Sequence, residues 1–188
     1  MKKIITSLMA LSLIFGASAQ DGMKGTYLLG ATQDITSTGW SDIQITPSVG
    51  YFVSDNIAVG LGLSYTSNKD MTIEVLGIVS DPMDMTSTTL SPFLRYYMDD
   101  KLFFVGGFDM TSSTTTNKPA GGTETESKNS SFGINVGAGL SLMWGDRVAV
   151  EPAFMIGTSS SKSEAGGTEV DGPTGLNAGF QIGLSLRM

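Results

Sequence analysis

The stretch "IAVGLGLSY", residues 57–65, alternates large and small residues along its whole length. In an extended strand, successive side chains point to opposite sides. The isoleucine, valine, leucines and tyrosine therefore share one face, whereas one alanine, two glycines and one serine share the other. A large face that points into a protein core would belong to a soluble β-protein. A large face that points into lipid would leave the small face to line the lumen of a membrane barrel.

The N-terminal residues predict export. Two lysines precede an apolar stretch at residues 4–15, and Ala17, Ser18 and Ala19 provide the small residues of a signal-peptide cleavage site. That stretch has 12 residues, whereas a membrane-spanning helix needs about 20. We therefore expect residues 1–19 to be a cleaved signal peptide and residues 20–188 to form one domain.

Charge and composition exclude several classes of function. Removing two lysines with the signal peptide leaves 9 basic against 18 acidic residues, a net charge of −9, which argues against nucleic acid as a partner. The chain has no cysteine and no histidine, so it lacks thiol nucleophiles and the commonest general base. Asp81 and Asp84, with Asp70 and Glu74, could hold calcium weakly, but their spacing matches no coordinating loop. We expect no enzymatic activity and no catalytic, cofactor or metal site.

An internal repeat indicates the number of strands. "PSVGYFVSDNI" (47–57) aligns with "PFLRYYMDDKL" (92–102), and "AGLSLMWGDRV" (138–148) repeats the latter half. The three turn aspartates are separated by 45 and 46 positions, and each marks a tight turn between two alternating runs. Three hairpins give six strands, and the runs "GTYLLGATQ" (25–33) and "LNAGFQIGLSLRM" (176–188) bring the total to eight.

The other connectors are long and rich in Thr, Ser, Gly and Asp. They lie at residues 34–41, 68–87, 111–129 and 159–173. Short turns therefore fall at one end of the assembly and long loops at the other. This segregation is typical of outer-membrane barrels.

The sixth predicted strand indicates which face is the lumen. Its larger face runs from Phe132 to Trp144, whereas its other face carries three glycines, an asparagine and a serine. Glycine on a water-exposed face would only weaken a strand, but small residues suit a narrow lumen. Aromatic residues then form two membrane-interface girdles, although they could instead be core residues of a soluble barrel. The girdle residues are Tyr27, Tyr51, Tyr96, Phe104 and Trp144 near the short turns, and Tyr65, Phe108 and Phe132 near the loops.

In these features the chain resembles the small eight-stranded outer-membrane β-barrel proteins, the group that includes the OmpA transmembrane domain and the OmpX and OmpW-type proteins. The resemblance covers residues 25–188 and implies an all-β, antiparallel up-and-down barrel in the outer membrane of a Gram-negative bacterium. It also implies periplasmic termini, contact with outer-membrane lipid, and the barrel-insertion machinery as an assembly partner. That family usually ends in an aromatic residue, whereas this chain ends in Met188.

Three charges interrupt the small face of the predicted strands: Arg95, Asp109 and Glu151. Arg95 precedes its turn aspartate by five residues and Glu151 follows its own by five, so both should lie at similar depth. Because a buried charge without a partner is costly, we predict a lumenal ion pair with Asp109 above it. This group would plug and order the interior. A gate or a solute-selecting ring is the alternative.

Pro47, Pro92 and Pro152 fall inside predicted strands. A closed barrel has no free edge where a missing N–H goes unnoticed, so we expect each proline to mark a bulge or a strand end.

The interior of an eight-stranded barrel is filled by its own side chains, which disfavours a general porin. We therefore expect a structural, adhesive or ligand-binding role through the external loops, toward an unknown surface ligand or host partner. Two alternatives stay open. One is a narrow passive channel for small or hydrophobic solutes, and the other is a secreted soluble lipid-binding barrel.

Overall fold

The computed structural model describes residues 22–34, 45–72, 74–75, 78–79, 81–99, 101–119 and 122–188. The predicted signal peptide lies outside the described residues. The strands are β1 (Tyr27–Asp34), β2 (Thr46–Phe52), β3 (Ile57–Met71), β4 (Glu74–Val75), β5 (Ile78–Val79), β6 (Met83–Tyr97), β7 (Leu102–Asn117), β8 (Thr125–Leu140), β9 (Leu142–Trp144), β10 (Val148–Ala165), β11 (Thr168–Asp171) and β12 (Gly175–Arg187). No helix in this part of the chain is long and apolar enough to span a membrane.

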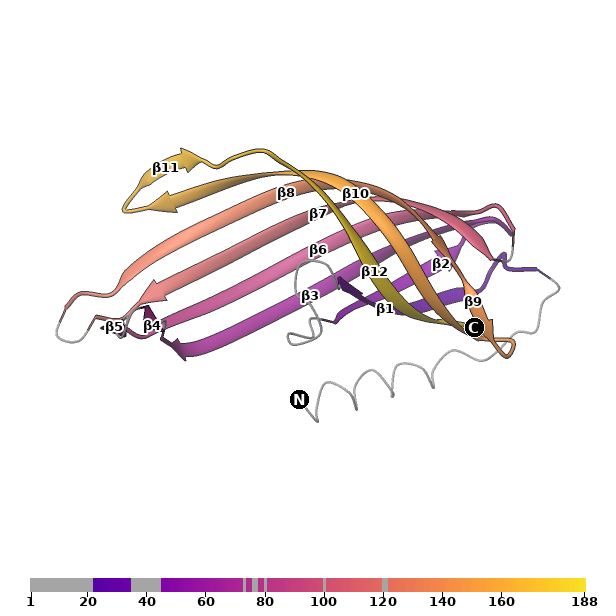
Figure 1. Ribbon diagram of the computed structural model, residues 1–188, viewed down its shortest axis with the longest axis horizontal. Helices are drawn as coiled ribbons and strands as arrows, with labels where there is room; N and C mark the ends of the chain where they lie inside the picture. The colour runs from indigo at the N-terminus through magenta and orange to yellow at the C-terminus, as the bar shows by residue number, and fades with distance from the viewer. Residues whose placement is uncertain are drawn as a thin grey trace.

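Eight strands close into an antiparallel barrel (Figure 1). Around the ring the order is β12, β1, β2, β3, β6, β7, β8 and β10. The pairing of β10 with β12 closes the ring. β9 continues β8 beyond a break at Ser141 and also pairs with β10. At the closure, the Tyr27 N–H donates to the Met188 carbonyl (2.6 Å), and the Met188 N–H donates to the Tyr27 carbonyl (2.9 Å). The predicted eight-stranded closed barrel is confirmed.

Short connections join β2 to β3, β6 to β7 and β9 to β10, where the repeat predicts the turns. The Asp99 carboxylate accepts the N–H groups of Lys101 (2.8 Å) and Leu102 (2.6 Å), which fixes the β6–β7 turn and lowers the pKa of Asp99. Gly145 adopts a φ of 71° in the β9–β10 turn, a conformation that favours glycine. Asp100, the turn aspartate of the second repeat, lies outside the described residues.

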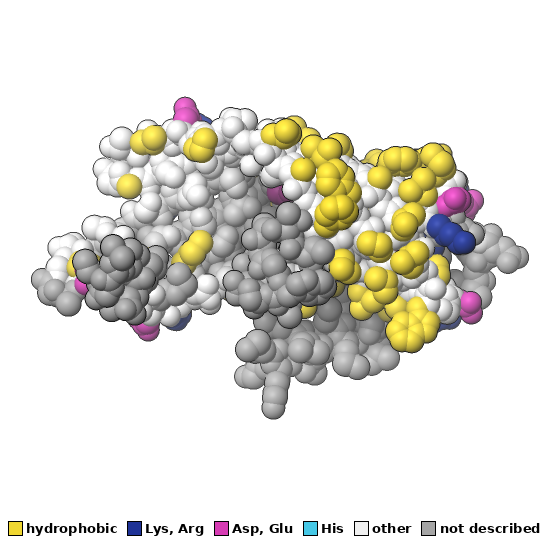
Figure 2. Space-filling model, viewed as in Figure 1, with side chains coloured by type: hydrophobic (Ala, Val, Ile, Leu, Met, Phe, Trp, Pro, Cys, Tyr) yellow, Lys and Arg dark blue, Asp and Glu magenta, His cyan; other side chains and the backbone are white. Residues whose placement is uncertain are grey.

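The large face of the strands points outward. In β3, Leu61 is 40% exposed and Tyr65 is 67% exposed, whereas Ala58 is fully buried. Figure 2 shows hydrophobic side chains gathered over the barrel half of the molecule and few over the opposite end. The secreted soluble barrel with an inward large face is therefore wrong, and the outer wall suits acyl chains.

Three of the four predicted connectors differ from expectation, because most of the described residues in 68–87, 111–129 and 159–173 are strand. Residues 35–41 of the fourth lie outside the described residues. β3, β6, β7, β8 and β10 continue past the barrel as a sheet (Figure 1) that carries β11 at one edge. Residues 111–117 pair with 125–131, so only a short loop separates β7 from β8. Thr is β-branched and favours strands, and the Thr89 and Thr111 hydroxyls hydrogen-bond across β6 and β7 (2.8 Å). These strands carry polar side chains on both faces, so their sequence does not show the alternation of apolar and polar residues by which a strand is predicted.

None of the three prolines marks a bulge, and only Pro47 lies at a strand end. Pro47 is the second residue of β2. Pro92 lies inside β6, where pairing with β7 lapses for two residues and resumes in unchanged register. Pro152 lies inside β10, opposite the end of β8 at the Ser141 break. The lost N–H therefore interrupts the ladder without shifting it. The register shift between β3 and β6 falls instead at residues 68–71.

We predict that Leu61→Arg destabilises the barrel, because it places a charge on the outward wall. The expected loss is about 2–4 kcal/mol near the bilayer midplane. Urea unfolding in lipid vesicles measures it. Thr114→Arg, on the sheet beyond the barrel, is the control and should change stability little. Equal losses for the two variants would contradict a lipid-facing wall.

Candidate functional site: the barrel lumen

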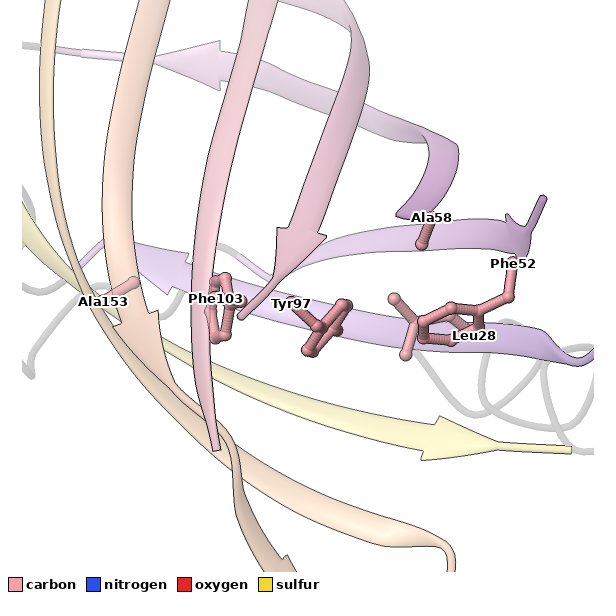
Figure 3. Close-up of a cluster of buried hydrophobic side chains, with 6 residues drawn as sticks. All are labelled: Leu28, Phe52, Ala58, Tyr97, Phe103 and Ala153. Atoms are coloured by element: carbon pink, nitrogen blue, oxygen red, sulfur yellow. The ribbon is translucent and has the colours of Figure 1, made fainter. Parts of the chain in front are cut away.

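Aromatic rings fill the lumen near the short turns. Phe52, Tyr97 and Phe103 are almost completely buried, as is Leu28 (Figure 3). Ring centroids lie 5.4 Å apart between Phe52 and Tyr97 and 5.6 Å apart between Tyr97 and Phe103. Strand alternation explains why Tyr97 enters the lumen, because its neighbour Tyr96 is on the outer face. The alternation pattern of the sequence did not predict these inner rings.

Glycines on neighbouring strands provide the room for two of the lumenal rings. A Cβ at Gly60 would collide with the Phe93 ring, and a Cβ at Gly139 would collide with the Phe103 ring. The small face is therefore a set of recesses for large side chains from adjacent strands. This arrangement fills a lumen that small residues alone would leave open.

The structure brings Arg95 and Glu151 together inside the lumen. Arg95 Nη1 lies 2.5 Å from Glu151 Oε2, and the two side chains are 10% and 2% exposed. The Ser141 hydroxyl donates to Glu151 Oε1 (3.3 Å), and Arg187 Nη2 donates to Ser141 Oγ (2.8 Å). This lumenal network (Arg95, Glu151, Ser141 and Arg187) connects β6, β10, the β8–β9 break and β12.

The network contains two arginines and one carboxylate, and aromatic rings face both cations. The Arg95 guanidinium lies 4.9 Å from the Phe103 centroid and 5.2 Å from that of Phe93, and Arg187 lies 5.0 Å from that of Tyr97. Such contacts stabilise a cation most strongly where water is excluded. The sequence prediction omitted Arg187, although this residue lies on the same small face of the last strand as Gln181, Gly183 and Ser185.

Asp109 does not join the network. Its Oδ2 accepts a hydrogen bond from Asn135 Nδ2 (2.6 Å), and both residues line a cavity of about 150 Å³. Arg95 and Glu151 also line this cavity, together with hydroxyl and amide side chains. Its polar walls suit several water molecules. Among the described residues, no group of three or more acidic, histidine or cysteine side chains could hold a metal ion.

The predicted girdle residues lie on the outer wall. Tyr27 and Tyr51 contact edge-to-face with centroids 5.3 Å apart, and Phe108 and Phe132 pair at 6.1 Å. Trp144, the last residue of β9, is 81% exposed. The exposed members also include Tyr65, Tyr96 and Phe104. A further outer pair, Phe154 and Phe180 (5.1 Å), was missing from the prediction.

Beyond the barrel, a lysine pairs with two of the four acidic residues considered for calcium. Lys118 Nζ lies 2.6 Å from Asp84 Oδ2 and 3.8 Å from Asp70 Oδ1. The Asp70 N–H also donates to Asp84 Oδ1 (2.9 Å), from a residue with a φ of 52°. The hydrogen bond from Lys118 is the main reason that the pKa of Asp84 is lowered. Lys118 thus provides a positive charge beside Asp70 and Asp84.

A family model described as outer membrane protein beta-barrel domain matches residues 6–187. A search of curated proteins found no match. Among solved structures, the chain is similar to Ail, the attachment invasion locus protein of Yersinia pestis (11% identity, TM-score 0.48, 88% of this chain and 100% of that one). It is also similar to the N-terminal β-barrel domain of Pseudomonas aeruginosa OprF (11%, 0.42, 90% and 100%) and to AlkL in lipid bilayers (15%, 0.45, 92% and 92%).

We predict that Arg95→Met destabilises the barrel by about 3–5 kcal/mol, because it leaves Glu151 buried without its cation. The double variant Arg95→Met/Glu151→Met should recover most of that loss, since no unpaired charge remains. Urea unfolding in vesicles provides this double-mutant cycle. Lys162→Met, which removes an exposed ion pair with Glu169 beyond the barrel, is the control and should have little effect. Additive losses in the cycle would show that the two charges are not coupled.

We predict that Lys118→Met raises the pKa of Asp84 toward its usual range. Because the folded-state pKa is lowered, the pair stabilises the sheet above the unfolded-state pKa, and this contribution is lost as pH falls through the folded-state value. A carboxyl-carbon NMR titration measures the shift. Lys162→Met is again the control and should leave Asp84 unchanged. An unaltered Asp84 titration in Lys118→Met would contradict the assignment.

Proposed function

Since this chain belongs to the family of outer membrane protein beta-barrel domains, we propose that it acts at the cell surface by adhesion or ligand binding, through the sheet beyond its barrel. It is an outer-membrane barrel protein, embedded in lipid. The outer aromatic residues serve as interface anchors in this proposal, and the lumenal network and rings plug and order the interior. The N-terminal residues serve as a signal peptide.

The observation that carries the proposal is the filled lumen. Buried rings and the Arg95–Glu151 pair occupy its cross-section near the short turns. The cavity of about 150 Å³ lies among these residues and the polar residues beyond them. A solute that enters this cavity would have to displace a buried ion pair and its supporting rings to pass. Binding outside the barrel needs no such rearrangement.

The sheet beyond the barrel, termed here the polar extension, comprises residues 66–72, 81–89, 111–119, 122–131 and 159–174. Its serine and threonine side chains can both donate and accept hydrogen bonds. It holds eight acidic and four basic residues, a net charge of 4 − 8 = −4. This balance disfavours polyanions and favours neutral or cationic ligands.

Shortening the extension tests the proposal. Ser112 and Ser130 face each other across β7 and β8, so replacing residues 113–129 with Asn-Gly would close a two-residue hairpin at that point. Bacteria expressing this variant should lose the adhesion to cultured cell layers that the wild-type protein confers. The variant should keep its heat-dependent gel migration, which reports a folded barrel. Adhesion that persists in a folded, truncated barrel would overturn the proposal.

Planar-bilayer recording tests the narrow channel, the second candidate, which the lumenal cavity favours. We expect the wild-type protein to give no reproducible conductance steps. Arg95→Met/Glu151→Met is the informative comparison, because it removes the charged pair while keeping side chains of similar size. Steps in the wild-type protein that this variant alters would instead support a channel.

A further inference from the structure

The outer wall carries an apolar groove across β6, β7, β8 and β10. Two neighbouring ladder rows cross it. In one row Leu94 and Val136 stand on either side of Gly106, and Ile156 follows Val136 on the next strand. In the other row Phe104 and Phe154 stand on either side of Ala138. Gly106 and Ala138 are diagonal neighbours on adjacent strands, so these two small residues form one continuous floor of the groove.

The groove has the size and lining of a ligand site. Its volume is about 500 Å³, within the range of roughly 300–1,000 Å³ usual for small-molecule sites. Ten residues line it, and the Tyr96 hydroxyl is their only polar side-chain group. The floor is also open, because a Cβ placed at Gly106 would have only Val136 Cγ1 within 4 Å, at 3.9 Å.

We propose that this groove binds one acyl chain of a phospholipid from the periplasmic leaflet and holds it more tightly than the surrounding annular lipid. In a bilayer the tails are as apolar as the wall, so the hydrophobic effect gives no preference for the groove. Dispersion contacts provide this preference, because an acyl chain that lies between Phe104 and Phe154 contacts fixed side chains on several sides.

The position of the groove identifies the leaflet. Tyr96 and Phe104 lie within two residues of the ends of β6 and β7 at the short turn, which is periplasmic in this family. The inner leaflet of the outer membrane consists of phospholipid. The two turns below the groove carry exposed Lys101 and Arg147 beside Asp99 and Asp146, and both charge signs suit a zwitterionic headgroup.

A second copy of the chain fits the groove less well. A twofold contact would place the groove against itself, and two concave floors of small residues would enclose a void. An empty space of that kind forfeits the contacts that drive association in lipid. A flexible chain can instead follow the floor.

The test uses the full mature protein in nanodiscs of palmitoyl-oleoyl phosphatidylethanolamine, transferred to mild detergent for native mass spectrometry. We expect a lipid-bound species for the wild-type protein and its loss in Gly106→Leu and in Ala138→Leu, which fill the floor from separate strands. Ala178→Leu is the matched control. Ala178 is exposed on β12 beside Ile156, outside the groove, so this variant should retain the lipid.

Heat-dependent gel migration identifies folded variants, and either groove variant that folds suffices for the comparison. An equal lipid-bound fraction in the wild-type protein and a folded groove variant would overturn the proposal. A lipid-free wild-type dimer that Gly106→Leu dissolves would also overturn it and would assign the groove to a second copy. Because this readout involves neither adhesion nor conductance, its result is independent of the proposed surface function.

Discussion

A strand inside a bilayer has no water to satisfy its backbone, so a sheet that enters lipid has to close on itself. Here closure falls between the first and last strands, where Tyr27 and Met188 exchange backbone hydrogen bonds. The rest of the barrel depends on this contact. The outer wall of the closed ring faces lipid and is therefore apolar. Because the ring has eight strands, its lumen is narrow enough for side chains to fill.

The narrow lumen explains why its chemistry depends on several strands at once. Arg95 and Glu151 come from strands on different sides of β7 and β8, and Arg187 comes from the strand that closes the ring. None of these charges could be buried alone without a large desolvation cost. Rings packed into glycine recesses bring the cations and the carboxylate together inside the narrow lumen, where cation–π contacts and the ion pair reinforce each other.

Beyond the membrane the constraint relaxes, and the architecture changes with it. The polar extension is an open sheet with a register shift at residues 68–71 and a left-handed backbone at Asp70, features that water can accommodate. Its strands carry polar side chains on both faces and bind each other through the ladder and threonine contacts. The protein thus has two parts: a closed, filled barrel in lipid and an open, solvated sheet whose surface is available to partners.

The sequence by itself determined the strand number, the short turns and the direction of the large face. A strand alternates its side chains with a period of two, small residues suit a narrow lumen, and turns require particular residues. Only the tertiary structure decided which inward residues meet, since that depends on the register between distant strands. The sequence predicted Asp109 above the ion pair, and only the pairing of β7 with β8 shows that its hydrogen-bond partner is Asn135. The same register puts Arg187 against Ser141, and it turns the expected loops into strands because their neighbours offer continuous ladders.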